Sequence, residues 1–251
     1  MPASDGIPLA EFIQDQFELI DWNELRPIIG ELDAKSRFFQ AQLRPAERLE
    51  TLTRADWNEL LAHIFAIRKH HQVLAADDER CLPSAVHDLL YGENPDLSER
   101  LNAFLAALDV INPEIGVDLA GEFLHFTFPD RYWLWARWMY NAATHTGTLP
   151  LLMDGDKELR GATPGETYLQ VGRAIVMVTQ VKDAEWLFHG GLTDAPLERP
   201  FAIDTFLAAS YGAYLYGITA WRLTREFHKV LPPLPRLIRR LLGLQVEKRT
   251  A

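Results

Sequence analysis

The sequence has almost no cysteine and no recognisable leader. Cys81 is the single cysteine among 251 residues, so no disulfide can form within the chain. A chain of this length buries enough surface to fold without a disulfide or a structural metal. Residues 1–6 show neither the basic start nor the apolar stretch of a signal peptide. We therefore expect a protein of a reducing compartment, the cytoplasm.

The motifs of several common enzyme classes are also missing. The chain has no Gly-x-Ser-x-Gly nucleophile elbow, no phosphate-binding loop and no Gly-x-Gly-x-x-Gly fingerprint. Glu122 and His125 form one Glu-x-x-His pair, with Asp118 one turn earlier, whereas helical di-iron proteins need two such pairs and two further glutamates. We expect no metal site. The sequence identifies no cofactor and leaves open whether the chain is an enzyme.

Positive charge is scarce except near the C-terminus. The chain carries 25 Lys and Arg against 35 Asp and Glu, a net charge of −10. Residues 222–251 alone have eight basic and two acidic residues, so this segment is +6 and the remainder is −16. An acidic body disfavours broad binding to phosphate backbones, which depends on clustered positive charge. Nucleic acid is therefore an improbable partner, reached if at all through the basic tail.

Apolar residues recur at helical spacing along most of the chain, which predicts a mainly α fold. We expect one helical domain of about nine or ten helices over residues 1–231, followed by a basic amphipathic tail helix in 232–251. Pro27 is expected to be the first residue of its helix, and Asp56 to be the N-cap of another.

A long helix is predicted over about residues 201–231. Its stretch 205–221 has no formal charge, but it is a little short for a membrane span and contains tyrosines and glycines. We interpret it as a helix buried in the core and expect no integral membrane span.

Glycine and proline gather in residues 141–165, which is typical of loops and turns. Loops of this length often contain short strands. We expect that residues 148–153 form a strand, within a small β-hairpin that covers about 132–153.

The segment from Phe123 to Asn141 is the most unusual part of the sequence. Five of the nine residues from Tyr132 to Tyr140 are aromatic, so the segment must be buried on more than one side or line a pocket or an interface. A core element with paired arginines is the simpler interpretation, and a site for a planar anion or a partner's anchor residues is the functional one. The candidate binding residues here are His125, Arg131, Trp133, Trp135, Arg137 and Trp138.

The predicted tail helix alternates leucine and isoleucine with three arginines, Arg236, Arg239 and Arg240. Such a helix can lie on an anionic membrane surface, cover a groove in a partner, or pack on its own domain. Packing on its own domain is the default expectation, and we keep the arginines as candidate binding residues.

Three functions remain open. We favour a non-enzymatic interaction or assembly subunit that uses the aromatic segment and the basic helix to bind a protein partner or a second copy. The first alternative is an enzyme or cofactor-binding protein with a pocket lined by tryptophan and arginine and His125 as its acid–base group. The second is a nucleic-acid adaptor. The interaction subunit is favoured because no nucleophile–base pair, carboxylate pair or metal set can be assembled from the sequence.

Overall fold

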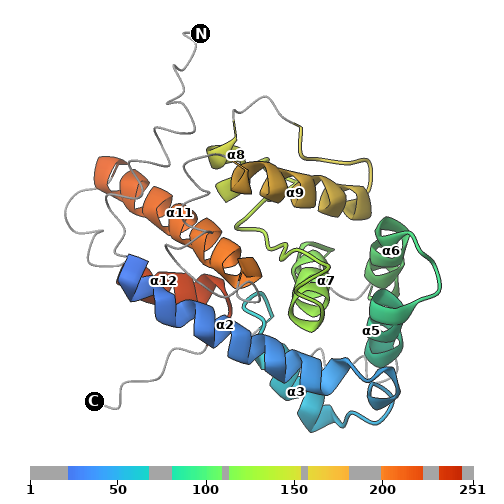
Figure 1. Cartoon of the computed structure of the whole chain (residues 1–251). Coiled ribbons are helices and arrows are strands. Elements are labelled where there is room, and N and C mark those ends of the chain that lie inside the picture. Colours follow the sequence, from blue (N-terminus) through green and yellow to red (C-terminus); the bar gives the residue numbers. More distant parts are fainter. Residues whose placement is uncertain are drawn as a thin grey trace.

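Nine α-helices and one short 3₁₀ helix make up the regular structure of the described residues (Figure 1). The computed structural model describes residues 22–67, 81–108, 113–153, 158–180, 199–222 and 232–244. The helices are α2 (Trp22–Leu43), η1 (Ala46–Arg48), α3 (Arg54–Ala62), α5 (Cys81–Tyr91), α6 (Leu97–Ala107), α7 (Pro113–Thr127), α8 (Thr148–Leu152), α9 (Pro164–Thr179), α11 (Arg199–Arg222) and α12 (Leu234–Leu241). The prediction of a mainly α fold with a single helical domain is confirmed.

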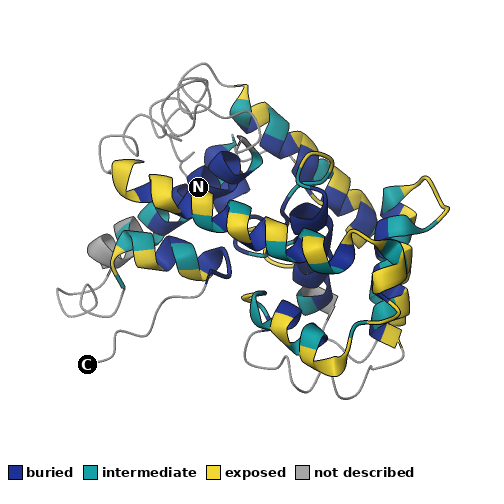
Figure 2. Ribbon diagram, turned by 60° about the horizontal axis from the view of Figure 1, so that its bottom comes forward, coloured by how far each residue is buried: buried dark blue, intermediate teal, exposed yellow. Residues whose placement is uncertain are grey.

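Helix α7 lies in the middle of the molecule (Figure 1), where it packs against α2, α5 and α6. Residues 116–127 of this helix are all buried, and five of its apolar side chains are completely buried: Leu119, Ala120, Phe123, Leu124 and Phe126. The outer helices bury one face each, as the colours of α2 show in Figure 2. The polar side chains of α7 that the structure describes are buried as well: Asp118, Glu122, His125 and Thr127.

Helix α2 begins five residues earlier than the sequence led us to expect, and Pro27 lies inside it. A proline this close to the start of a helix removes one hydrogen bond. Leu25, Ile28 and Ile29 are all buried around it, so tertiary packing holds the first turns of the helix in place. The prediction that the helix starts at Pro27 is wrong. It took account of the hydrogen bond that Pro27 removes, but not of the burial of the residues around it.

The start of helix α3 also differs from the prediction. Its N-cap is Thr53, and Asp56 is the third helical residue of a capping box. The Thr53 hydroxyl accepts the backbone N–H of Asp56, and the Asp56 carboxylate accepts the backbone N–H of Thr53 at 2.8 Å. The two hydrogen bonds satisfy free donors at the helix start, which explains why Thr53 rather than Asp56 sets the boundary.

The strand expected at residues 148–153 is a helix, α8. Residues 132–153 contain one isolated antiparallel bridge, between Asn141 and Thr146, and the described parts of the chain form no strand. Residues 132–136 have no regular secondary structure and run between α7 and α9 (Figure 1), with the Trp135 backbone against Gly121 of α7 and the Trp133 indole against Gly172 of α9. The density of aromatic residues in this segment therefore indicates burial and not a sheet.

Helix α11 is buried along its first half, from Phe201 to Ser210, in agreement with the interpretation of a core helix. No helix of the described chain combines the length and the apolar character that a membrane crossing requires. Residues 223–231, the predicted end of this helix, lie outside the described residues.

Gly165 in the first turn of α9 allows a close approach of α9 to α6, and we predict that alanine cannot replace it without loss of stability. A Cβ atom at this position would overlap the backbone carbonyl of Ser98, which cannot rotate away. Overpacking of this kind costs about 1–3 kcal/mol. Urea unfolding of Gly165→Ala measures the loss.

Gly30 in α2 provides the matched control, because a Cβ there would meet no atom within 4 Å. Gly30→Ala should stabilise the protein by about 0.5–1 kcal/mol, the usual gain of alanine over glycine within a helix. Equal effects of the two substitutions would contradict the close contact between α6 and α9.

Candidate functional site

Three ionisable side chains lie on one face of α7, and each is paired with a different part of the chain. Asp118, Glu122 and His125 are spaced at i, i+4 and i+7, which places them above one another along the helix. All three are buried. Their spacing in the sequence predicts the common face but not the partners.

Lys35 of α2 is the partner of Glu122. Its Nζ donates to Glu122 Oε2 at 2.6 Å and to the backbone carbonyl of Leu242 at 2.9 Å, and it lies 4.1 Å from the centre of the Phe126 ring. Burial lowers the pKa of Lys35 and raises the pKa of Glu122, while the mutual attraction opposes both shifts. This single ammonium group thus joins α2, α7 and the residues that follow α12.

His125 is bonded through both ring nitrogens. Nε2 lies 2.7 Å from Asp204 Oδ2 of α11, and Nδ1 lies 2.8 Å from the carbonyl oxygen of Tyr132. Burial acts to lower the pKa of His125, but the Asp204 carboxylate, the Tyr132 carbonyl and Glu122 together outweigh it and raise the pKa. Both nitrogens are therefore committed to internal partners, and neither is directed at a ligand.

Arg137 is the partner of Asp118. The Asp118 carboxylate accepts the backbone N–H of Arg137 at 2.7 Å and its Nε–H at 2.8 Å. This double contact fixes the loop after Trp135 against α7. Arg137 and Asn141 lie between two cavities and line both of them.

The aromatic segment contributes mainly to the core. Trp135 and Trp138 are buried, and Trp133 is half-buried. The Trp135 indole N–H donates to the carbonyl of Tyr140 at 3.0 Å, and the Tyr168 hydroxyl of α9 donates to the carbonyl of Trp133 at 2.9 Å. The segment is thus covered by α7 on one side and α9 on the other, as expected for a run that is apolar on both faces.

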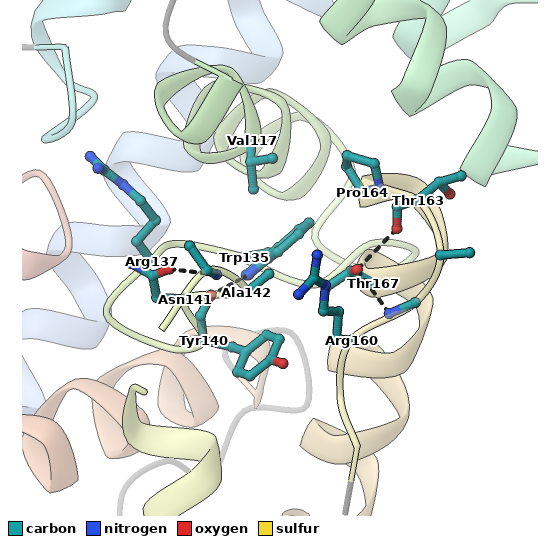
Figure 3. A pocket seen from close by; sticks show the side chains of 13 residues that line it. Val117, Trp135, Arg137, Tyr140, Asn141, Ala142, Arg160, Thr163, Pro164 and Thr167 are labelled. Atoms are coloured by element: carbon teal, nitrogen blue, oxygen red, sulfur yellow. Dashed lines mark hydrogen bonds between the residues drawn. The ribbon is translucent and has the colours of Figure 1, made fainter. Parts of the chain in front are cut away.

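Three hollows adjoin this framework. The Trp135 cavity, about 250 Å³, lies between α7, residues 137–143 and the turn before α9 (Figure 3). The α7 cavity, about 310 Å³, is lined by Asp118, Glu122 and Trp138 and by residues of α11 and α12. The α9 groove, about 660 Å³, follows α9 beside Arg131 and Trp133. His125 lines none of the three, so the arrangement does not place it where an acid–base group would act.

The remaining candidate residues are separated. Arg131 is exposed and lies 5.5 Å from the centre of the Phe128 ring. Arg239 makes a two-pronged ion pair with Glu31, with Nη2 2.7 Å from Oε1 and Nε 2.9 Å from Oε2. Arg240 lies over the Phe65 ring, and Arg236 is exposed. The apolar side of α12 is buried against its own domain, which agrees with the expectation that this helix packs on its own domain.

Four charged residues of this region were missed by sequence analysis. Asp204 is a lone charge among mostly apolar neighbours in a predicted helix, a pattern that could have marked it as a buried partner. Lys35 stands between the charged residues Asp33 and Arg37, so no local signal sets it apart. Arg160 and Arg173 line hollows, but they are exposed residues on a loop and a helix surface. No sequence signal separates these two from other surface arginines.

A metal centre is not formed by the described side chains, because no three His, Cys, Asp or Glu residues among them are grouped to hold an ion. The arrangement can hold a neutral or anionic molecule in its hollows and can present an apolar surface along α9. Comparisons with protein-family models, with curated proteins and with solved structures find no match for this chain.

Proposed function

We propose that the chain is a non-catalytic interaction protein that binds an acidic amphipathic segment of a protein partner in the α9 groove. The supporting observation is the composition of the groove. Leu169 and Met177, two of the three large apolar side chains exposed in the described residues, lie along it with exposures of 39% and 43%. Monomeric proteins seldom leave such residues together on one surface without a use.

The groove residues of α9 form a regular stripe. Leu169, Gly172, Arg173, Val176 and Met177 are spaced at i, i+3, i+4, i+7 and i+8, so they lie on one face of the helix. An amphipathic partner helix packs its own apolar stripe into a surface of this shape.

Trp133 gives the groove an aromatic floor next to α9. Its indole lies against Gly172, where a Cβ atom would overlap the ring. Tryptophan, methionine and arginine are enriched in protein interfaces, and buried tryptophans often contribute most of the binding energy.

Charge indicates the nature of the partner. Arg131 and Arg173 line the groove, and no carboxylate of the described residues does, although the chain outside its C-terminal segment is strongly acidic. Opposite charge steers association and rejects partners of like charge. An acidic segment therefore fits this surface better than a basic one, and better than a second acidic body of this chain.

Charge reversal in the groove tests the proposal. The probes are two fluorescein-labelled helical peptides with the same leucine stripe, one with glutamates and one with lysines at the polar positions. We expect the native chain to bind the acidic peptide at least tenfold more tightly, measured by fluorescence anisotropy. Arg131→Glu with Arg173→Glu should remove this preference or reverse it.

The C-terminal arginines supply the matched control. Arg236→Glu with Arg240→Glu makes the same change of charge on another exposed surface and should leave peptide binding within twofold. Loss of binding in this control but not in the groove variant would overturn the proposal in favour of the C-terminal helix. Equal binding of the two peptides would overturn it as well, and sedimentation of the native chain would show whether a second copy occupies the groove.

A further inference from the structure

The Trp135 cavity has no part in the proposed interaction, yet its walls are built as those of a ligand site are. Its lining is mostly apolar and comes from three places: Val117 of α7, the segment with Trp135, Tyr140 and Ala142, and Pro164 at the start of α9 (Figure 3). Trp135 also lines it, although most of its indole is buried in the core. Ligand sites of proteins combine apolar walls of this kind with a few polar groups that fix orientation.

The walls are held in place before any ligand arrives. The Trp135 indole is fixed by its hydrogen bond to Tyr140, and the Asn141 side-chain oxygen accepts the backbone N–H of Ala143 at 2.9 Å. The Thr167 hydroxyl accepts the N–H of Gly161 at 3.0 Å and donates to the carbonyl of Thr163 at 2.9 Å. A preformed wall saves the entropy of ordering on binding.

The polar groups that remain for a ligand are donors. Figure 3 shows the Arg160 side chain extending toward the Trp135 indole, whereas Arg137 turns away to the other side of its loop, where it meets Asp118. In the described part of the chain, the Arg160 guanidinium makes no hydrogen bond or ion pair. Because its oxygen is already engaged, Asn141 can offer its amide NH₂ group. Among the described residues, no carboxylate lines the cavity.

The start of α9 does not itself supply the donors. The Glu166 carboxylate accepts the backbone N–H groups of Ala162 and Thr163, and the Asn102 side chain accepts that of Gly165. Arg160 is therefore the positive group of the cavity. Its guanidinium can hold a carboxylate through two parallel hydrogen bonds.

We propose that the Trp135 cavity binds a small aromatic carboxylate. The ring of the ligand lies against Trp135 and Tyr140, and its carboxylate meets Arg160 and the Asn141 amide. The volume of about 250 Å³ is below the range of about 300–1,000 Å³ that drug-sized ligands occupy, so the ligand has one or two rings. This site is separate from the α9 groove and does not depend on the proposed interaction.

Calorimetric titration of the full chain tests the site with three probes: phenylacetate, phenylacetamide and acetate. Phenylacetamide has the same ring without the charge, and acetate has the charge without the ring. We expect phenylacetate to bind about tenfold or more tightly than either, because it alone provides both contacts. Arg160→Gln should lower the affinity for phenylacetate to that for phenylacetamide. Arg160→Lys should retain part of the difference between the two affinities.

Arg173→Gln is the matched control, since it removes an exposed arginine from the groove and should leave phenylacetate binding unchanged. Arg160 is itself exposed, so its substitution does not threaten the fold. The proposal is overturned if phenylacetate and phenylacetamide bind equally, if none of the probes binds at millimolar concentration, or if Arg160→Gln binds phenylacetate as the native chain does. Peptide binding in the groove should be the same in Arg160→Gln, so failure of one proposal is distinguishable from failure of the other.

Discussion

Lys35→Met is expected to lower the free energy of unfolding by about 3–5 kcal/mol, the usual cost of removing one partner from a buried ion pair. The substitution leaves the Glu122 carboxylate buried without its ammonium partner at 2.6 Å, and burial already raises the pKa of this carboxyl. It also removes the donor to the Leu242 carbonyl, so the contact between α2 and the end of α12 weakens. Urea unfolding followed by circular dichroism measures the loss.

The double variant Lys35→Met, Glu122→Leu tests whether the two charges affect stability as a pair. Replacing both charges by apolar groups of similar size is often neutral or stabilising, so we expect the double variant to regain most of the lost stability. Arg37→Met is the surface control, because Arg37 pairs with Asp33 while remaining 78% exposed. A double variant no more stable than Lys35→Met would show that the two charges do not act as a pair.

Asp204→Asn is expected to destabilise the fold by an amount that depends on pH. The pKa of His125 is raised in the folded state, so the native protein binds a proton more readily than the unfolded chain does. The stabilisation from this pair is fully present below the ordinary pKa of histidine, about 6.5, and is lost as the pH rises through the higher folded pKa. At the acidic end we expect a cost of about 3–5 kcal/mol, since the variant leaves His125 buried without its carboxylate partner.

The measurement is the urea midpoint of the native chain and of Asp204→Asn from below pH 6 to above pH 8. The difference between the two urea midpoints should become smaller as the pH increases. His87 and Asp88 form a comparable pair on the surface, 43% and 72% exposed, so Asp88→Asn should change stability little at any pH. A difference in urea midpoint that stays constant or increases with pH would show that His125 is neutral in the folded protein.

The helical fold could be predicted because apolar spacing repeats along the chain, but the helix boundaries depended on tertiary contacts. Pro27 lies within α2 because Leu25 and Ile28 are buried on either side of it. Residues 148–152 form a helix although they lie in a segment rich in glycine and proline, where we expected a short strand. Local patterns do not include tertiary packing, which explains why the start of α2 and the type of the element at 148–152 were predicted incorrectly.

The shared face of the site residues on α7 could be predicted from the sequence, but their partners on other elements could not. The common face of Asp118, Glu122 and His125 follows from helix geometry alone. Their partners come from distant parts of the sequence: Lys35 is 87 residues from Glu122, and Asp204 is 79 residues from His125. A single sequence carries no information about which distant residues meet, so the ion pairs and the hollows beside them required the structure.

The three ion pairs also determine the register of the neighbouring elements on α7. Apolar side chains pack almost as well when one helix slides past another by a turn, which is about 5.4 Å. A buried charge does not tolerate such a slide, because it would leave its partner and remain in an apolar environment. The ion pairs connect α7 to α2, to α11 and to the loop after Trp135. They therefore fix the position of each of these elements along α7 and around its axis. The charged face of α7 thus selects one arrangement among the several that its apolar surface alone would accept.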